Sequence, residues 1–351
     1  MLQISAQMLA MSSEYAVLEK NGKVVYANTG AQSLLGSNCV GMSIAAVFGE
    51  ELAGIQAPSF IGNFSIAGKH RIVRTCSMDG MRVFFISDTE ENPSLVNDSF
   101  IFSLRNCLMN LNVSVAVMLE RGHIPPEMAD QFSNLCHECY KIGRIISNIS
   151  TIRSLWDKSL VVSPVQLDVA RHFRDTIESI RILLDGIELR FTAPGPIMLR
   201  SDPSLLDTLL LNLISNCLCH AEGCSRINVA LSHVKGKLLL RVDNNGRGIA
   251  QDELHAVFDS YRRNLKLGNM DRGTGLGLTA VRLIAAAHDG ILLLESREEQ
   301  GTTVCVSLGD LNMSYEPLEQ GLNVYEKSMS TLLTGLANCL PSSFYTEKYL
   351  Y

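Results

Sequence analysis

Several features that mark membrane, secreted and nucleic-acid-binding proteins are absent from this sequence. No apolar run reaches the roughly 18–20 residues that a membrane-spanning helix needs. The opening stretch, MLQISAQMLAMSSEY, lacks the basic region and cleavage site of a signal peptide. There is no basic run, and the net charge is −6, so composition gives no reason to expect a nucleic-acid partner. We therefore expect a cytoplasmic protein without a membrane span.

The cysteines also lack a pattern. Ten of them are scattered over 351 residues without framework spacing, which predicts free thiols in a reducing compartment. Cys136 and Cys139 form a CxxC pair around His137, and a metal or redox site is conceivable there. No second ligand pair follows nearby, so two small buried residues are the simpler interpretation. An apolar content of 46% and a charged content of 19% indicate a globular chain of two or three domains.

Residues 1–90 carry short β-type runs separated by glycine and asparagine. YAVLEKNGKVVYAN predicts a hairpin that turns at Asn21 and Gly22. A helix is expected over 29–35, and later strands at HRIVRTCSM and MRVFFISD around Asp79-Gly80. This order, with NGKVVYANTGAQSLLG, resembles a PAS sensor domain. The resemblance implies a sensor of a small molecule or partner, or a fold used only for dimerisation. We expect His70 to be a surface residue rather than a ligand.

Residues 91–98 are polar and predict a linker, and residues 99–158 then show helical periodicity on both sides of the turn GHIPPE. Two long helices joined by a short turn form an antiparallel hairpin with too little partner surface of its own. Pairing two hairpins into a four-helix bundle would bury the remaining apolar faces. We therefore predict a homodimer.

Residues 159–312 alternate helices with strands, and two strand hairpins, INVALSHVKGKLLLRVDN and ILLLESREEQGTTVCVSLG, lie in this region. SDPSLLDTLLLNLISNCLCHA predicts one helix, capped by Ser201 or Asp202 with Pro203 in its first turn. Mixed helices and a largely antiparallel sheet predict a two-layer α/β sandwich. Residues 313–351 are expected to form a helical extension that packs on this sheet or binds a partner.

Four short blocks in this region can build a nucleotide pocket. Asn212 and Asn216 lie four residues apart on one helix face, and amide oxygens suit a Mg²⁺ ion that bridges phosphates. VDNNGRGI ends a strand with two glycines that let the backbone approach a base. GTGLGL precedes a helix, so its amides can face phosphate oxygens. The loop between, with Arg262, Arg263, Lys266 and Arg272, could close as a lid.

These blocks resemble the N, G1, F and G2 boxes of the GHKL ATPase domain in the form found in sensor histidine kinases. The resemblance spans about 155 residues and implies ATP as ligand, with Mg²⁺ held by Asn216 and supported by Asn212. The cofactor-binding residues it implies are Asn212, Asn216, His220, Asn244, Gly246, Gly248, Phe258, Arg262, Arg263, Gly273, Thr274, Gly275, Leu276 and Gly277. His220 is expected near the phosphates, or else to be structural.

One departure from the family lies inside the pocket. The G1 box of the family has an aspartate that accepts a hydrogen bond from the adenine amino group, and the aligned residue here is Asn244. Asp243 cannot replace it, because neighbouring strand residues point to opposite faces. Asn244 keeps a carbonyl acceptor without the charge, so we expect ATP binding that is weaker than with aspartate.

A second departure concerns the phosphoacceptor. The family's first hairpin helix carries a histidine followed by an acidic residue, but the matching positions here are Phe102 and Ser103. A phenyl ring has no nucleophilic atom, and Ser103 has no evident base to activate it. His137-Glu138 repeats the dipeptide on the second helix, roughly 13 Å nearer the closed end of the hairpin at about 1.5 Å per residue. His137 is the alternative acceptor, and an ordinary surface role is the other possibility.

Three functions remain open on the sequence alone. The first is a cytoplasmic, dimeric, histidine-kinase-like signalling protein that binds ATP and Mg²⁺ and has lost or displaced in-chain histidine phosphorylation. The second is a working kinase with an unusual acceptor that passes phosphate to a response regulator. The third is a GHKL-type scaffold or anti-sigma-like binding module. The signal, the downstream partner and the role of residues 313–351 are not determined by the sequence.

Overall fold

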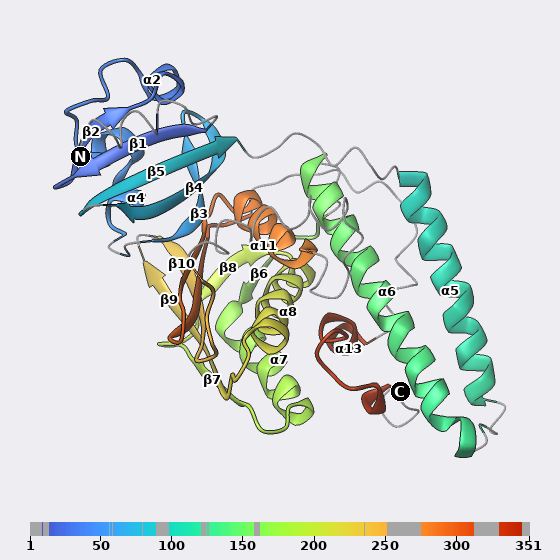
Figure 1. Cartoon of the computed structure of the whole chain (residues 1–351). Helices are drawn as coiled ribbons and strands as arrows, with labels where there is room; N and C mark the ends of the chain where they lie inside the picture. Colours follow the sequence, from blue (N-terminus) through green and yellow to red (C-terminus); the bar gives the residue numbers. More distant parts are fainter. Residues whose placement is uncertain are drawn as a thin grey trace.

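The computed structural model describes residues 9, 14–55, 57, 59–78, 80–88, 98–120, 124, 126–157, 162–234, 236–250, 275–311 and 330–345. Figure 1 shows an N-terminal sheet with short helices, a central sheet covered by helices, and a pair of long helices beside it. The linker predicted at 91–98 lies almost wholly outside the described residues.

The N-terminal part is an antiparallel sheet in the order β2-β1-β5-β4-β3. Its elements are β1 (Tyr15–Lys20), β2 (Lys23–Ala27), α2 (Thr29–Leu35), α3 (Ile44–Phe48), α4 (Glu50–Ala53), β3 (Ile61–Ile66), β4 (Lys69–Met78) and β5 (Met81–Asp88). Asn21 and Gly22 both have positive φ, 53° and 77°, as the predicted tight turn requires. Asn28 caps α2 by accepting from the Ala31 amide at 2.9 Å. The predicted hairpin, helix and late strands are confirmed; β3 was not predicted, and the PAS assignment stays a prediction.

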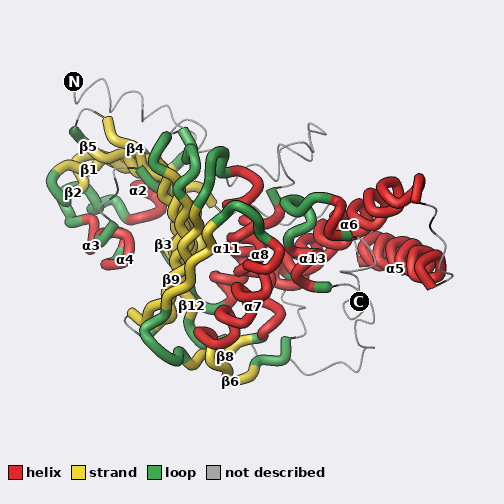
Figure 2. The backbone as a smooth tube through the Cα atoms, turned by 90° about the horizontal axis from the view of Figure 1, so that it is seen from below, coloured by secondary structure: helices red, strands yellow, loops and turns green. Residues whose placement is uncertain are grey.

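The central part has strands on one side and helices on the other, as Figure 2 shows. Its elements are β6 (Val165–Asp168), α7 (Val169–Leu183), β7 (Glu188–Thr192), β8 (Met198–Ser201), α8 (Pro203–His220), β9 (Arg226–Val234), β10 (Lys237–Asn244), α11 (Leu276–Ala287), β11 (Leu292–Arg297) and β12 (Gly301–Leu308). Asp202 is the N-cap of α8 and accepts from the Ser204 amide, with Pro203 in the first turn. Both predicted strand hairpins form, β9–β10 and β11–β12. This part is therefore the predicted two-layer arrangement.

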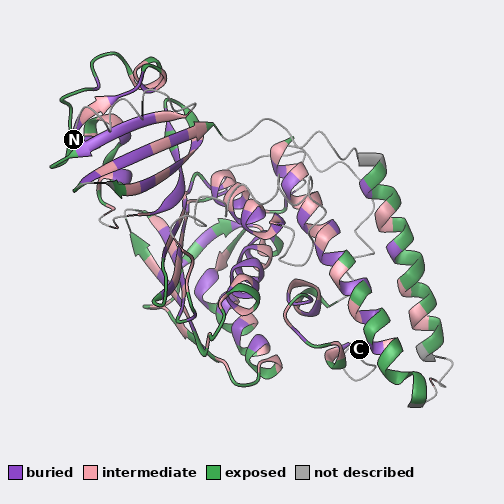
Figure 3. Ribbon diagram, viewed as in Figure 1, coloured by how far each residue is buried: buried purple, intermediate pink, exposed green. Residues whose placement is uncertain are grey.

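The paired helices are α5 (Asp98–Glu120) and α6 (Ala129–Trp156). A short 3₁₀ turn, η1 (Pro126–Met128), directly precedes α6. They pack through Ile101, Leu108, Cys139 and Ile146. Figure 3 shows that much of α5 is exposed. The exposed apolar side chains of α5 are Phe100, Phe102, Met109, Leu111, Val113, Val117 and Met118. By length and composition the window Phe100–Met118 could also cross a membrane, with 11% of it buried.

The N-terminal and central sheets are continuous, which the division into separate domains did not predict. Among the described residues, β3 pairs with β11 through Gly62 opposite Leu293 and Ile61 opposite Leu294, and the result is one ten-stranded sheet. The side-chain oxygen Oδ1 of the buried Asn63 accepts from the Leu292 amide at 2.6 Å. The edge of the central sheet is thus covered by the N-terminal part.

The C-terminal segment contains α13 (Thr331–Gly335) and the 3₁₀ turn η2 (Ser342–Phe344) and lies between α6 and α8, rather than on the sheet (Figure 1). Tyr345 is fully buried, stacks on His137 at 4.5 Å between ring centroids, and donates to the Leu333 carbonyl at 3.0 Å. Ser133 donates to the Ser342 carbonyl. This segment therefore joins the hairpin to the central part.

Candidate nucleotide-binding site

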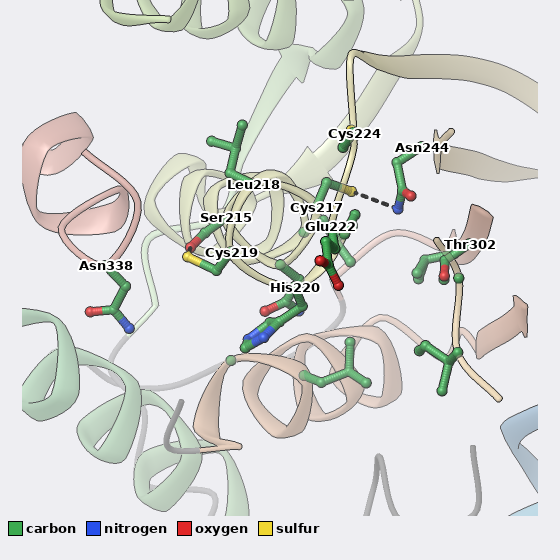
Figure 4. Close-up of a pocket in the computed structure, with 18 of the residues that line it drawn as sticks. Ser215, Cys217, Leu218, Cys219, His220, Glu222, Cys224, Asn244, Thr302 and Asn338 are labelled. Carbon is green, nitrogen blue, oxygen red and sulfur yellow. Dashed lines mark hydrogen bonds between the residues drawn. The ribbon is translucent and has the colours of Figure 1, made fainter. Parts of the chain in front are cut away.

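A cavity of about 1060 Å³ lies between the C-terminal half of α8, the end of β10, the start of α11 and one face of α6. Figure 4 shows part of its lining. Of the predicted cofactor residues, the lining includes Asn216, His220, Asn244, Gly248, Gly275 and Gly277. Gly246 lines a smaller adjoining cavity of about 380 Å³. Phe258, Arg262, Arg263, Gly273 and Thr274 lie outside the described residues.

The two asparagines of α8 have different surroundings. Asn216 lines the cavity. Asn212 is buried, and its side-chain amide hydrogen-bonds to other protein groups. Asn212 Nδ2 donates to Asn148 Oδ1 at 3.0 Å and to the Thr208 carbonyl at 2.9 Å. Asn216 therefore offers its amide to a ligand, while Asn212 holds neighbouring elements in place.

The residues present fit Mg²⁺ bound together with phosphate rather than alone. Among the described residues, no group of three His, Cys, Asp or Glu side chains lies close enough to hold a metal ion. Mg²⁺ takes octahedral oxygen ligands and commonly keeps several waters while contacting substrate phosphates. An ion beside Asn216 would therefore take most of its ligands from phosphate and water.

Asn244 lies at the end of β10 with its side chain buried at the cavity wall. Its Oδ1 accepts from the Gly246 amide at 3.1 Å, and its Nδ2 donates to Cys217 Sγ at 3.5 Å (Figure 4). Asp243 belongs to the other face of the strand, where it accepts from Asn228 Nδ2 at 2.7 Å. The expectation that Asp243 cannot replace Asn244 agrees with this geometry.

The glycines of the G1 block are needed by the protein itself. Gly248 has a φ of 77°, and a Cβ there would lie 2.1 Å from the Arg297 carbonyl oxygen. A Cβ at Gly246 would lie 2.6 Å from the Ala221 side chain. Close packing of this loop on the end of α8 and on β11 therefore excludes any side chain at either position.

The G2 block begins α11 without a side-chain cap. Gly275 is the N-cap residue, in the left-handed conformation with φ 67°, and as a glycine it supplies no side-chain hydrogen bond to the first amides of the helix. Unsatisfied amides at a helix start favour an anion. Leu276 is buried against Ile152 of α6 and does not line the cavity. Its role is to dock the hairpin on α11, because its side chain belongs to that apolar contact.

His220 ends α8 at the cavity wall. Desolvation and the nearby Arg144 cation lower its pKa, so the imidazole is neutral at pH 7. A neutral imidazole can donate one hydrogen bond to a phosphate oxygen but carries no charge to attract it. His220 is therefore a polar contact of this site rather than its cation.

Helix α6 contributes three residues to the cavity that were not predicted from the sequence. Arg144, Ile145 and Asn148 all line it. Arg144 donates to Ser215 Oγ at 2.7 Å and to Asn212 Oδ1 at 3.3 Å. No sequence signal marks them, since their contact with α8 depends on how two distant segments dock.

The alternative phosphoacceptor is covered in this structure. His137 Nε2 lies 2.6 Å from the Ala337 carbonyl oxygen, and its ring stacks on Tyr345. Burial lowers the pKa of His137. Phe102, in contrast, is 65% exposed on α5. The C-terminal segment thus covers the His137 ring. Phe102, at the exposed position on α5, has no nucleophilic atom.

The CxxC pair has the surroundings of structural thiols. Cys136 and Cys139 are both buried, and burial raises the pKa of Cys136 to about 11. A thiol with so high a pKa is a poor nucleophile and a poor metal ligand at neutral pH. The interpretation as small buried residues fits this geometry.

Comparison with known proteins agrees with the cavity geometry. The family "Histidine kinase-, DNA gyrase B-, and HSP90-like ATPase" matches residues 201–311, which contain α8 to β12. "Sensor-like histidine kinase SenX3" of Mycobacterium tuberculosis is 26% identical over 186 residues, 52% of this chain and 45% of that protein. "Histidine protein kinase DivJ" of Caulobacter vibrioides is 35% identical over 124 residues, 35% of this chain and 21% of that protein. The chain spans about half the length of the SenX3 proteins that it matches.

Among solved structures, full-length ShkA in complex with AMPPNP covers 63% of this chain and 47% of that chain with a TM-score of 0.51. Its sequence identity is 18%, so this likeness concerns the fold alone. The family match and the sequence relatives carry the assignment. Residues 201–311 match the histidine kinase-, DNA gyrase B- and HSP90-like ATPase family, and the chain is similar in sequence to sensor histidine kinases.

Proposed function

We propose that this chain is a cytoplasmic, dimeric signalling protein that binds ATP and Mg²⁺ and has lost or displaced in-chain histidine phosphorylation. The observation that carries the proposal is the cavity of the ATPase domain, in which Asn216, Asn244 and the uncapped start of α11 are brought together. These groups supply what a nucleotide needs. Asn244 accepts from the adenine amino group, and the first amides of α11 bind phosphate oxygens.

Asn216 would hold Mg²⁺ together with the phosphates, and the ion would supply positive charge that offsets part of theirs. The loss of in-chain phosphorylation rests on Phe102, which is exposed where the family has a histidine, and on His137, which is covered by Tyr345 and Ala337. We therefore infer that ATP acts here as a conformational ligand, or supports phosphorylation of another protein.

The dimer is supported by the apolar side of α5. Met109 and Val113, four residues apart on one face of α5, are 40% and 56% exposed, and a second copy of the hairpin would cover such side chains. We expect Val113→Glu to convert a dimer to a monomer in light scattering, while Ser114→Glu, at the neighbouring position on α5, leaves it dimeric. A wild-type chain that is monomeric at all concentrations contradicts the dimer.

Titration calorimetry with ATP and Mg²⁺ tests nucleotide binding. We expect binding by the wild type and a loss of at least tenfold in affinity in Asn216→Ala. No binding at millimolar ATP shows a vestigial pocket and favours a scaffold or anti-sigma-like module.

Incubation with γ-labelled ATP tests the phosphotransfer alternative, in which a response regulator is the downstream partner. We expect no label on the chain. An acid-labile, base-stable label that disappears in His137→Ala would instead establish a working kinase with an unusual acceptor. In that case the C-terminal segment must leave His137 before transfer.

A further inference from the structure

Arg144 is a buried cation in an unusual setting. It lies on α6, outside the matched ATPase domain, yet it lines the nucleotide cavity and is 8% exposed. Its hydrogen-bond partners are the Ser215 hydroxyl at 2.7 Å and the side-chain oxygen Oδ1 of Asn212 at 3.3 Å, both neutral. Within the described part of the chain, no carboxylate forms an ion pair with it.

Such an arrangement is costly without an anion. A guanidinium presents five N–H donors and cannot lose its charge in a protein. Removing a charge from water carries a desolvation penalty that neutral oxygens compensate only in part. The cation of Arg144 therefore favours an anionic group arriving from the cavity that it lines.

The contacts of Arg144 place it near the start of α11. Asn212 Oδ1, which accepts from Arg144, lies so close to Gly277 that a Cβ there would be 2.7 Å from it. Gly277 follows directly after the uncapped start of α11. Arg144 also lowers the pKa of His220 by its charge. These neighbours belong to the part of the site suited to phosphate.

The position of Arg144 is fixed by an apolar contact between α6 and α11. Ile145, Ile149 and Ile152 of α6 pack with Leu276, Ala280 and Leu283 of α11. The hairpin and the phosphate-facing helix are thus in direct contact, with Arg144 beside this contact.

We propose that Arg144 of the hairpin binds the phosphate chain of the nucleotide held by the ATPase domain. Nucleotide affinity then depends on the docking of α6 on α11, and a nucleotide with phosphates favours the docked arrangement. This inference rests on the ATP binding proposed above. A charged nitrogen fork beside phosphate oxygens forms charge-assisted hydrogen bonds, which a neutral side chain does not replace.

Calorimetry on the full chain with ATP, ADP and adenosine tests the inference through two matched substitutions. Arg144→Gln can still donate to Ser215 or Asn212 but has no charge, whereas Arg144→Lys keeps the charge. We expect Arg144→Gln to weaken ATP binding at least tenfold and adenosine binding less than twofold. We expect Arg144→Lys to recover part of the ATP affinity.

Lys141→Met is the control, because it removes a cation from the same helix, one turn away, that pairs with Glu138. We expect ATP affinity within twofold of the wild type. Thermal unfolding without nucleotide completes the test, and Arg144→Gln should melt no lower than the wild type since it relieves the desolvation of a charge.

Two results overturn the inference while ATP binding by the wild type stands. The first is an ATP affinity of Arg144→Gln within twofold of the wild type. The second is an equal loss for ATP and adenosine together with a lower melting temperature, which assigns Arg144 a structural role. If the wild type binds no ATP, the proposed function fails and this inference fails with it.

Discussion

Asn244 stands in this cavity where the GHKL ATPases that the sequence resembles have an aspartate. Its neutral oxygen already accepts from the Gly246 amide, and its nitrogen faces Cys217. A neutral acceptor binds a donor less strongly than a carboxylate does, by roughly a factor of two in hydrogen-bond energy. The proposed hydrogen bond from the adenine amino group to Asn244 is therefore weaker than one to an aspartate would be.

We expect Asn244→Asp to tighten ATP binding, by about tenfold if the added charge contributes about 1.4 kcal/mol. Calorimetry with ATP and with inosine triphosphate, whose 6-oxo group offers no amino donor, measures the base contact. The substitution should raise the preference for ATP over inosine triphosphate. Asn245→Asp serves as the control, because Asn245 binds the Ser225 and Arg226 amides instead. An unchanged preference for ATP over inosine triphosphate would mean that Asn244 does not contact the adenine amino group.

His172 gives a pH dependence to the packing of α7 on α8. Its Nε2 lies 2.9 Å from Asp207 Oδ1, and this hydrogen bond raises the pKa of His172 in spite of partial burial. A histidine whose pKa is raised on folding stabilises the protein below its unfolded pKa, and the contribution is lost as pH rises through the folded pKa.

We therefore expect Asp207→Asn to reduce the free energy of unfolding by about 1 kcal/mol near pH 5.5 and by less near pH 8.5. Chemical denaturation at the two pH values measures the difference. In a His172→Gln background the loss should no longer vary with pH. The same loss at both pH values in the wild-type background would refute the assignment.

At the scale of elements, the C-terminal segment connects α6 to α8. It fills the space between α6 and α8, where Leu336, Ala337 and Tyr345 are fully buried. Cys339 Sγ lies 2.9 Å from Ser215 Oγ, the hydroxyl that also accepts from Arg144. The segment thus supports the helix face from which the cavity is built, and it covers His137.

Substitutions of Tyr345 test how much the packing of the C-terminal segment stabilises the protein. We expect Tyr345→Ala to cost about 3–5 kcal/mol of stability through the lost aromatic volume. Tyr345→Phe should cost about 1 kcal/mol, because it removes only the hydrogen bond to Leu333. Urea denaturation followed by fluorescence of Trp156, the one tryptophan and the last residue of α6, reports the change. Equal losses for the two variants would contradict the observed packing.

At the scale of the whole molecule, the continuous sheet links the N-terminal part to the ATPase domain. The link is short, two residue pairs between β3 and β11 together with the Asn63–Leu292 hydrogen bond. A side chain at Gly62 would lie 2.7 Å from the Leu292 carbonyl oxygen. Backbone contacts therefore connect the N-terminal part to β11, one strand from β12 and Thr302 at the cavity.

We expect Gly62→Val to separate the two sheets, since the clash is with backbone that cannot rotate away. Hydrogen exchange should then speed up at the Leu292–Leu294 amides and stay unchanged in β9 and β10. Ser65→Val is the control, because Ser65 is exposed on β3 and pairs with His70 of β4 rather than with β11. Faster exchange in both variants would show general loosening of β3 instead of a broken junction.

Local patterns in the sequence were sufficient for much of this protein. The Asn21-Gly22 turn, the capped start of α8, the periodicity of α5 and α6 and the order of the N, G1 and G2 blocks depend on near neighbours in the chain, so they are readable without a structure. The same holds for the absent nucleophile at Phe102, because a residue type is known from the sequence itself.

Only the tertiary structure decided which distant segments meet. It brought Arg144 of α6 to the cavity of α8 and α11, joined β3 to β11, and placed Tyr345 over His137. Each of these contacts depends on the docking of surfaces that many apolar side chains would satisfy equally well, and such docking leaves no periodic trace in the sequence. The blocks of the pocket were therefore predictable, but the cation that completes its lining and the cover over the alternative acceptor were not.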